Sequence, residues 1–200
     1  MKIRNVLPVF ALFSLLLTVA CNDSKNGNTI QGQSDKLIAQ TTTQSKIVEE
    51  KLPTILEFAS MDKGFSTLTS AIKATELTKS LGNEGSYTIF APVNLAFDKL
   101  RPGTVERLLK PENMEQLKTI LNCHIIPNVI TEEDIAIAIK EGNGSVKLKT
   151  IGGALLTATM KGDRVFLIDQ MGNGGNLVTT DVKASNGLIH TIDAVMMPKK

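Results

Sequence analysis

The sequence has very few aromatic side chains. Tryptophan is absent, tyrosine occurs once, and the three aromatic types together make up 4% of the 200 residues. A hydrophobic core therefore cannot rely on large rings, and we expect leucine, isoleucine, valine, alanine and methionine to fill it. The length suits one domain with an ordinary core.

Cysteine and histidine are also scarce, with two residues of each type. The sequence contains no HExxH, GxSxG or CxxC motif, so the usual signatures of zinc peptidases, serine hydrolases and thiol redox proteins are missing. If Cys21 carries a lipid, Cys123 has no partner and no disulfide forms within the chain. We expect Cys123 to be a buried small apolar side chain, not a reactive thiol.

Neither sign of charge is in excess. The chain has 22 Lys and Arg against 20 Asp and Glu, and its first 20 residues contain Lys2, Arg4 and no acidic residue. Without those 20 residues the basic count falls from 22 to 20 and the formal charges balance. A balanced chain lacks the basic footprint of a nucleic-acid binder, so we expect no nucleic-acid partner.

The longest apolar run, residues 6–20, is too short for an ordinary membrane-spanning helix. It follows Lys2 and Arg4 and leads to Cys21, which is the pattern of a secretory signal peptide over residues 1–20. Residues 17–21, Leu-Thr-Val-Ala-Cys, resemble a bacterial lipobox, in which the chain is cut before a cysteine that becomes lipidated. We expect acyl chains on Cys21 to hold the protein on a bilayer. The alternative is a plain secretory signal with an incidental Cys21.

The rest of the chain divides into a polar segment and one domain. Residues 21–46 have too little apolar surface to offset chain entropy, so we expect a flexible tether. From residue 47 to about residue 140 the apolar residues follow a helical period, interrupted by a strand at residues 87–90. From about residue 140 to the C-terminus they alternate as in strands. Helices first and strands last predict an α+β domain over residues 47–200, with an antiparallel sheet and not a βαβ winding.

Several local signals refine this prediction. Thr131 to Asp134 have the spacing of a capping box, Lys161-Gly162-Asp163 indicates a hairpin turn, and Lys147 with Lys149 indicates an edge strand. The glycine-rich residues 172–176 lack the ending of a phosphate loop and are expected to form a loop before a strand at residues 177–183. The next strand begins near residue 188 and is expected to end at Pro198.

Three segments carry a family resemblance: Tyr-Thr-Ile-Phe-Ala-Pro-Val-Asn-Leu-Ala-Phe at 87–97, Asn-Cys-His-Ile-Ile-Pro at 122–127, and Asn-Gly-Leu-Ile-His-Thr-Ile-Asp-Ala-Val-Met-Met-Pro at 186–198. In this order and spacing they resemble the fasciclin-type (FAS1) domain, a family of extracellular adhesion and interaction modules. The resemblance implies an antiparallel β-wedge with several helices packed on one side.

Six residues in or near these segments are expected to serve the structure. Asn186-Gly187 is a strong turn signal, and Asp181 is expected to hydrogen-bond across that turn. His190 shares a strand face with Leu188 and Ile192, so we expect a core histidine bonded to backbone or to an aspartate. Asn94 is placed to cap the helix that follows it. The full set is Asn94, Asp181, Asn186, Gly187, His190 and Asp193.

The family resemblance also implies a partner surface. In adhesive members, a central Tyr-His segment and the hydrophobic residues near it are associated with receptor contacts. Here Cys123 stands before the histidine in place of tyrosine. The corresponding residues are His124, Ile125, Ile126 and Pro127.

We therefore expect a lipid-anchored bacterial envelope protein whose domain binds a protein or surface glycan without catalysis, cofactor or metal. The alternative is an envelope small-ligand binder or hydrolase that uses His124, His190 and Asp181. A concave pocket joining both histidines and an acid within hydrogen-bond reach would favour that alternative. Histidines packed apart, each with a backbone partner, would favour the interaction module.

Overall fold

The computed structural model describes residues 51–81 and 85–199. The expected signal peptide, Cys21 and the tether lie outside the described residues. The helical elements are α1 (Ile55–Met61), η1 (Lys63–Phe65), α2 (Ser66–Ala74), α3 (Thr78–Leu81), α4 (Asn94–Asp98), α5 (Thr104–Leu108), η2 (Pro111–Asn113), α6 (Met114–Asn122) and α7 (Glu132–Glu141). The strands are β1 (Tyr87–Pro92), β2 (Ile125–Ile126), β3 (Ser145–Lys149), β4 (Leu155–Lys161), β5 (Arg164–Ile168), β6 (Gly174–Asn176), β7 (Val182–Ala184) and β8 (Gly187–Ile192).

The strands form two four-stranded sheets, with the orders β2-β1-β8-β7 and β3-β4-β5-β6. The second sheet is antiparallel throughout, but in the first sheet β1 and β8 are parallel, with Phe90 opposite His190. A parallel pair needs a long crossover connection, and here residues 93–186 lie between the two strands. The α+β class is confirmed, while the expectation of a purely antiparallel sheet is wrong for this central pair.

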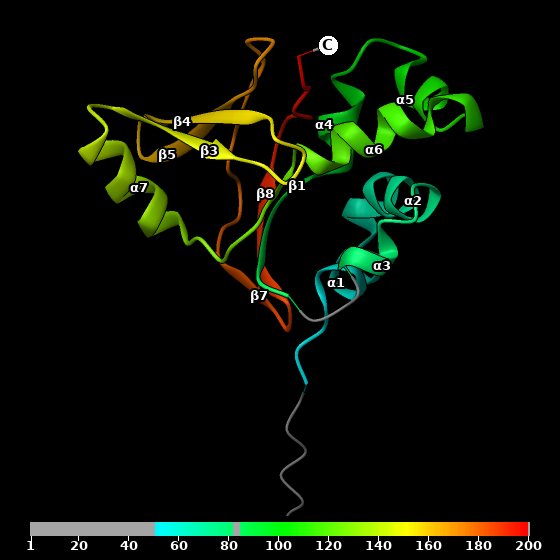
Figure 1. Ribbon diagram of the computed structural model, residues 1–200, viewed down its shortest axis with the longest axis horizontal. Coiled ribbons are helices and arrows are strands. Elements are labelled where there is room, and N and C mark those ends of the chain that lie inside the picture. The colour runs from blue at the N-terminus through cyan, green and yellow to red at the C-terminus, as the bar shows by residue number, and fades with distance from the viewer. Residues whose placement is uncertain (1–50, 82–84, 200) are drawn as a thin grey trace, which may run out of the picture. The chain divides into compact units, whose positions relative to one another are not determined.

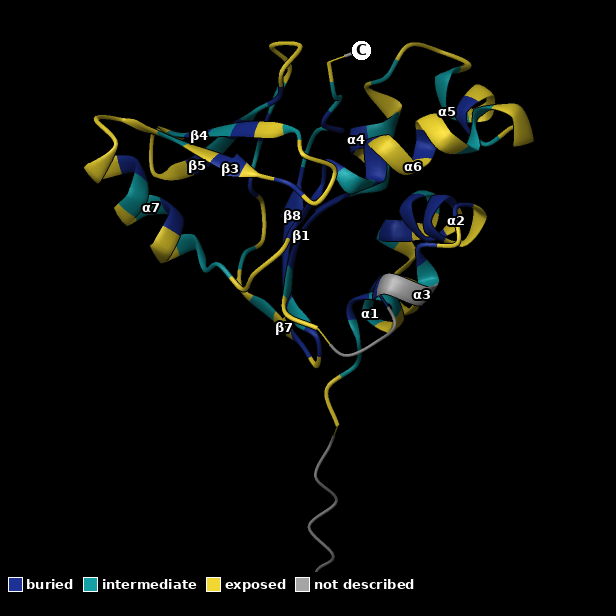
Figure 2. Cartoon of the chain, in the orientation of Figure 1, coloured by how far each residue is buried: buried dark blue, intermediate teal, exposed yellow. Residues whose placement is uncertain are grey.

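The first sheet is the middle layer of the domain (Figure 1). Helices α1 to α6 lie on one side of β1 and β8, and the second sheet with α7 lies on the other. Successive residues of β1 enter different cores, because Ile89 and Ala91 pack with the helices whereas Phe90 packs with the second sheet and α7. Both central strands are accordingly buried over nearly their whole length (Figure 2). The core is aliphatic apart from Phe65 and Phe90, as the composition predicts.

Local sequence signals gave the expected structure in three places. Thr131 and Asp134 form the capping box at the start of α7. Lys161 pairs with Arg164 across the turn between β4 and β5. β3, with its two lysines, is an edge strand of the second sheet.

The glycine-rich segment at 172–176 was misread as a loop. Residues Gly174–Asn176 form β6, which pairs with β5, and the strand expected over residues 177–183 reduces to β7. An added Cβ at Gly174 would overlap the ring of Phe166, so glycine here permits a close approach of a strand to a bulky neighbour. The last strand is also shorter than expected, since β8 ends at Ile192 and not at Pro198.

Candidate functional site

The turn before β8 joins distant parts of the chain. The Asn186 side chain is buried; its Oδ1 accepts from the backbone N–H of Ile55 at 2.9 Å and its Nδ2 donates to the carbonyl of Leu81 at 2.6 Å. It thereby connects the start of α1 with the end of α3. Gly187 has φ 150°, and a Cβ on it would overlap the carbonyl oxygen of Tyr87 on the neighbouring strand. Only glycine fits this position.

His190 is completely buried in the middle of β8. Its Nε2 lies 2.9 Å from the carbonyl oxygen of Ile130, and its Nδ1 accepts from the backbone N–H of Asp181 at 3.2 Å. These partners assign the ring proton to Nε2 and the lone pair to Nδ1, which describes a neutral imidazole. The ring stacks on Phe90, with centroids 5.6 Å apart. His190 is thus a core histidine bonded to backbone, as the strand pattern predicts.

Asp181 does not direct its carboxylate at the Asn186-Gly187 turn. Its Oδ1 accepts from the backbone N–H of Glu132 at 3.0 Å and lies 4.0 Å from Nδ1 of His190. The acid therefore fixes the start of α7, and the distance to the imidazole is too long for a hydrogen bond.

His124 is equally buried but has the opposite tautomer. Its Nδ1 lies 2.8 Å from the carbonyl oxygen of Ile120, and its Nε2 accepts from the backbone N–H of Met196 at 2.9 Å. Burial lowers the pKa of His124 to about 4, although the bond to Ile120 and the charge of Asp169 both act to raise it. The ring is neutral at pH 7 and both of its nitrogens are occupied.

The expected partner surface needs a correction. His124, Ile125 and Ile126 are at most 3% exposed, because β2 lies beside β1 and its two residues enter the two cores. Of these four residues, only Pro127 is exposed.

Cys123 is buried as expected. Burial raises the pKa of its thiol to about 11, so the reactive thiolate is absent at pH 7.

Asn94 caps a helix other than the expected one. Val93 occupies the N-cap position of α4, so Asn94 lies one residue inside that helix. Its Oδ1 accepts from Thr67 N–H in the first turn of α2, and its Nδ2 donates to the carbonyl of Lys63 and to Ser66 Oγ. The residue is structural, but it connects α4 to α2 instead of starting its own helix.

Asp193 lies just after β8 and holds the strand to β6. Its Oδ1 accepts from Asn176 N–H at 2.7 Å, and its Oδ2 lies 3.3 Å from Lys99 Nζ. Burial acts to raise the pKa of Asp193, but the bonds from Asn176 and Lys99 outweigh it and keep the pKa lowered. The carboxylate is fully engaged by neighbours.

The sequence analysis missed Asp169, which is buried at the end of β5. Its carboxylate accepts from the backbone N–H groups of Met171, Asn173 and Met197, at 2.8 Å in each case, and from Asn173 Nδ2. It thereby attaches both the 170–173 turn and the C-terminal segment to β5. An aspartate directly before a turn is a local signal for the first of these contacts only.

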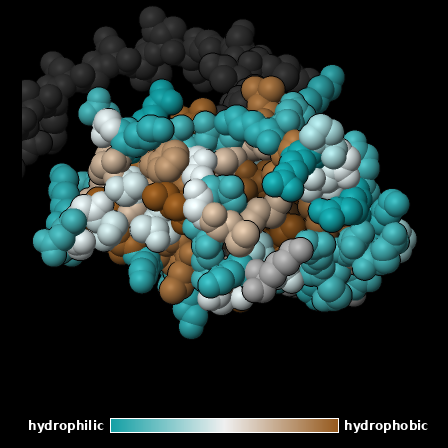
Figure 3. Space-filling view, turned by 90° about the horizontal axis from the view of Figure 1, so that it is seen from above, coloured by the Kyte–Doolittle hydropathy of each residue, from teal (hydrophilic) through white to brown (hydrophobic). Residues whose placement is uncertain are grey.

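Beside these closed networks lies an open cleft of about 710 Å³ between α4–α6 on one side and residues 171–174 and 194–199 on the other. We call it the basic cleft, since four cations line it: Lys99, Arg101, Arg107 and Lys199. Its apolar lining includes Leu100, Ile120, Met171, Val195 and Met197. On the face seen in Figure 3, hydrophobic surface lies in the middle and hydrophilic side chains surround it.

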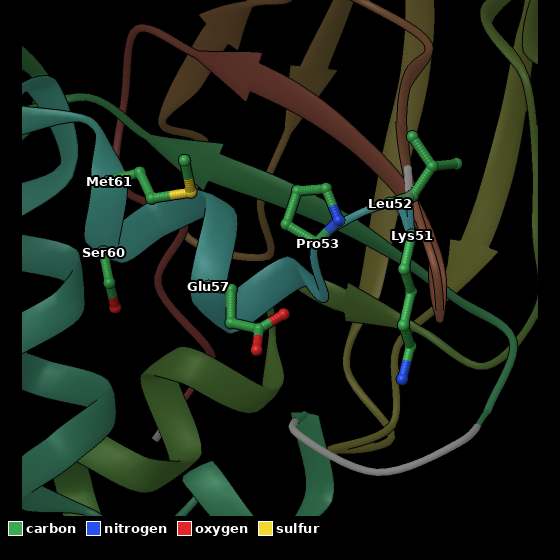
Figure 4. A pocket seen from close by; sticks show the side chains of 6 residues that line it. All are labelled: Lys51, Leu52, Pro53, Glu57, Ser60 and Met61. Atoms are coloured by element: carbon green, nitrogen blue, oxygen red, sulfur yellow. The ribbon is translucent and has the colours of Figure 1, made fainter. Parts of the chain in front are cut away.

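A second hollow of about 690 Å³ lies at the start of the described chain. It is lined by α1 and the residues before it. Its side chains point in different directions, as Figure 4 shows for Leu52, Glu57 and Met61. It therefore lacks the converging polar groups of a binding site.

The described residues offer neither a metal site nor a catalytic constellation around the histidines. No group of three or more His, Cys, Asp or Glu side chains within residues 51–81 and 85–199 is arranged to hold a metal ion. No helix in the same ranges is long and apolar enough to cross a membrane. Both imidazoles are buried with both nitrogens bonded inside the protein, so neither can reach a substrate.

Comparison with known proteins agrees with this architecture. Residues 63–198 match the family model of the Fasciclin domain. Protein sll1483 of Synechocystis sp. is 39% identical over 163 residues, which cover 80% of this chain and 83% of that protein. The cell surface glycolipoprotein MPB83 of Mycobacterium bovis is 34% identical over 145 residues, covering 70% of this chain and 58% of that protein.

The fold is also similar to a solved structure. A FAS1 domain pair from the insect cell adhesion molecule Fasciclin I superposes with a TM-score of 0.64 at 23% identity, over 72% of this chain and 51% of that chain. The expected FAS1 fold is confirmed.

Proposed function

The chain belongs to the fasciclin domain family, and from that premise we propose that it is a lipid-anchored protein of the bacterial cell envelope. Its domain acts as a non-catalytic adhesion or interaction module for another protein or for a surface glycan. The names of two relatives support this role, since one is a cell surface glycolipoprotein and the other a cell adhesion molecule.

One observation carries the non-catalytic part of the proposal. His124 and His190, the two histidines of the chain, are each bonded to backbone groups through both ring nitrogens. A general base must hold a free lone pair within reach of the substrate proton, and neither ring does. The alternative of a ligand binder or hydrolase at His124, His190 and Asp181 therefore loses its geometric basis.

The partner surface that we propose consists of two neighbouring loops, residues 127–129 and 178–181. They are joined through Glu132, whose Oε2 accepts from Thr180 Oγ1 at 2.7 Å and whose N–H binds Asp181. Val129 and Val178 are about half exposed, at 49% and 53%, and Pro127 is exposed beside them. Apolar side chains held outward on anchored loops are typical of contact surfaces.

An adhesion assay tests this surface. Cells displaying the protein with Val129→Asp and Val178→Asp should adhere about tenfold less to the partner surface, because charges replace apolar contacts at the centre of the interface. The matched control is Ile137→Asp, since Ile137 is similarly exposed but lies on α7. Equal adhesion of the double variant and the control, at unchanged melting temperature, would place the contact elsewhere.

A fractionation experiment tests the anchor. Cys21→Ser should release the protein from membranes, because the acyl chains have no other attachment site. Thr18→Leu retains Cys21 and should stay membrane-bound. If Cys21→Ser remains in the membrane fraction and the wild-type protein is found mainly unprocessed, the lipid anchor is refuted while the adhesion role stands.

A further inference from the structure

The basic cleft combines four cations with apolar side chains, and we propose that it binds a single anionic amphiphile. The ligand has one alkyl chain headed by a carboxylate or a phosphate. This inference concerns a site on other elements than the adhesive loops and does not depend on the adhesion role.

The charges of the cleft favour an anion. Within residues 51–81 and 85–199, Lys99 is the one of these four cations that has an ionic partner, which is Asp193. Arg101, Arg107 and Lys199 form no ion pair with any described residue and are exposed to solvent. No aspartate or glutamate from the described part of the chain lines the cleft. Unpaired guanidinium groups around one opening are suited to a carboxylate or a phosphate.

The floor of the cleft favours an alkyl chain. Leu100 and Met197 are partly exposed and Met171 is 58% exposed, so these three side chains supply accessible apolar surface. Ile120 and Val195 also line the cleft but are almost fully buried. A volume of about 710 Å³ lies within the range of small-ligand sites, which are typically about 300–1,000 Å³. A bare anion such as phosphate would leave this apolar surface uncovered.

The walls of the cleft are fixed before any ligand binds. Asp169 holds Met171 and Met197 through their backbone N–H groups, so the 171–174 segment and the C-terminal segment keep their positions. Lys99 donates to the carbonyl oxygen of Asp193 at 2.6 Å and thereby holds α4 against the opposite wall. A preformed cleft lowers the ordering cost of binding.

The binding test uses the full chain in detergent-free buffer with dodecanoate as the probe, titrated below the concentration at which it aggregates. We expect dodecanoate and dodecyl phosphate to bind with micromolar affinity. Dodecyltrimethylammonium, which has the same chain and the opposite charge, should bind at least about tenfold more weakly. Acetate and inorganic phosphate should not compete. Equal affinity for the cationic and the anionic amphiphile would overturn the proposal.

Substitutions then locate the site. Arg101→Gln and Arg107→Gln should each weaken dodecanoate binding about tenfold, because each removes a charge-assisted hydrogen bond. The controls Lys110→Gln and Lys118→Gln remove exposed cations that do not line the cleft and should leave the affinity within about twofold. If all four variants bind alike, the amphiphile does not occupy the cleft.

A cavity-filling variant tests whether the alkyl chain of the ligand occupies the cleft, separately from the attraction of its charged head group. Thr119 is exposed on α6 and lines the cleft, so Thr119→Trp should fill it and abolish dodecanoate binding without lowering the melting temperature. Lys118→Trp, on the adjacent exposed position, is its control. If the protein binds phosphatidylglycerol vesicles but no monomeric dodecanoate, the cations face a membrane surface and the single-ligand site is refuted.

Discussion

The polar groups of the two histidines and those of the basic cleft differ in whether they have partners inside the protein. Around His124 and His190, every ring nitrogen meets a backbone partner inside the protein. Around the cleft, Arg101, Arg107 and Lys199 lack an ionic partner among the described residues and face solvent. Saturated buried groups contribute to stability, whereas unpaired exposed groups contribute little to it and are available to a ligand. The buried histidines of the family segments therefore serve the fold, and ligand binding is expected at exposed, unpaired groups such as those of the cleft.

The largest effect is expected where β8 approaches β1 most closely. Gly187→Ala places a Cβ against the Tyr87 carbonyl at a positive φ, and we expect it to lower the free energy of unfolding by roughly 4 kcal/mol. Gly103→Ala is the control, because Gly103 also has a positive φ but open space around it, and should cost about 1 kcal/mol. Urea denaturation of the two variants measures the difference. Similar losses would mean that the backbone angle alone, and not the strand contact, requires glycine.

The next effect is a pH dependence centred on His124. Its pKa is lowered from 6.5 to about 4 in the folded state, so between those values the unfolded chain binds the additional proton. The neutral ring therefore makes its full contribution to the free energy of unfolding above pH 6.5. This contribution, roughly 3 kcal/mol in total, is lost as the pH falls towards 4. Denaturant unfolding between pH 4 and 7 measures it. His124→Gln lacks the titrating ring and should give a flatter curve; an equally steep curve would assign the dependence to other groups.

A smaller loss is expected at His190. His190→Ala leaves the carbonyl of Ile130 and the N–H of Asp181 without their partner, which should lower the free energy of unfolding by about 1–3 kcal/mol. Adhesion should fall only in proportion to the unfolded fraction. A stable His190→Ala protein that has lost a defined enzymatic activity would overturn the proposed function.

The smallest effect is expected at the cleft. Arg101→Gln and Arg107→Gln should each change the free energy of unfolding by less than about 0.5 kcal/mol, since neither side chain forms an ion pair with a described residue. Lys99→Gln, which breaks the contacts to Asp193, should cost more, on the order of 1 kcal/mol. Thermal melting of the three variants measures how much stability each substitution removes. A loss at either arginine equal to that at Lys99 would indicate a structural role and weaken the contrast between the two regions.

The sequence predicted those features that depend on neighbours along the chain. The capping box of Thr131, the hairpin at residues 161–164 and the burial of His190 all follow from short-range spacing. The three family segments predicted the FAS1 fold, and they supply the two central strands of the first sheet, β1 and β8, together with its edge strand β2.

The features that were missed join residues distant in sequence. Asn94 bonds to α2, some 27 residues earlier, and Asp169 binds Met197, 28 residues later. β1 pairs with β8 across almost 100 residues. Local periodicity carries no information on such contacts. The basic cleft is assembled from several segments in the same way, so no single stretch of sequence indicates it.

The most direct test of the account is the tautomeric state of the two histidines, read from the nitrogen-15 shifts of their rings at pH 7. Because the chain has two histidines, the spectrum contains two imidazoles and is readily assigned. We expect two neutral rings in slow exchange with solvent, His124 with its proton on Nδ1 and His190 with its proton on Nε2. A ring that exchanges rapidly between tautomers would contradict the account, because its nitrogens would not be held by fixed partners. A ring that carries two protons at pH 7 would contradict it as well, because the nitrogen that accepts a backbone N–H would then be protonated.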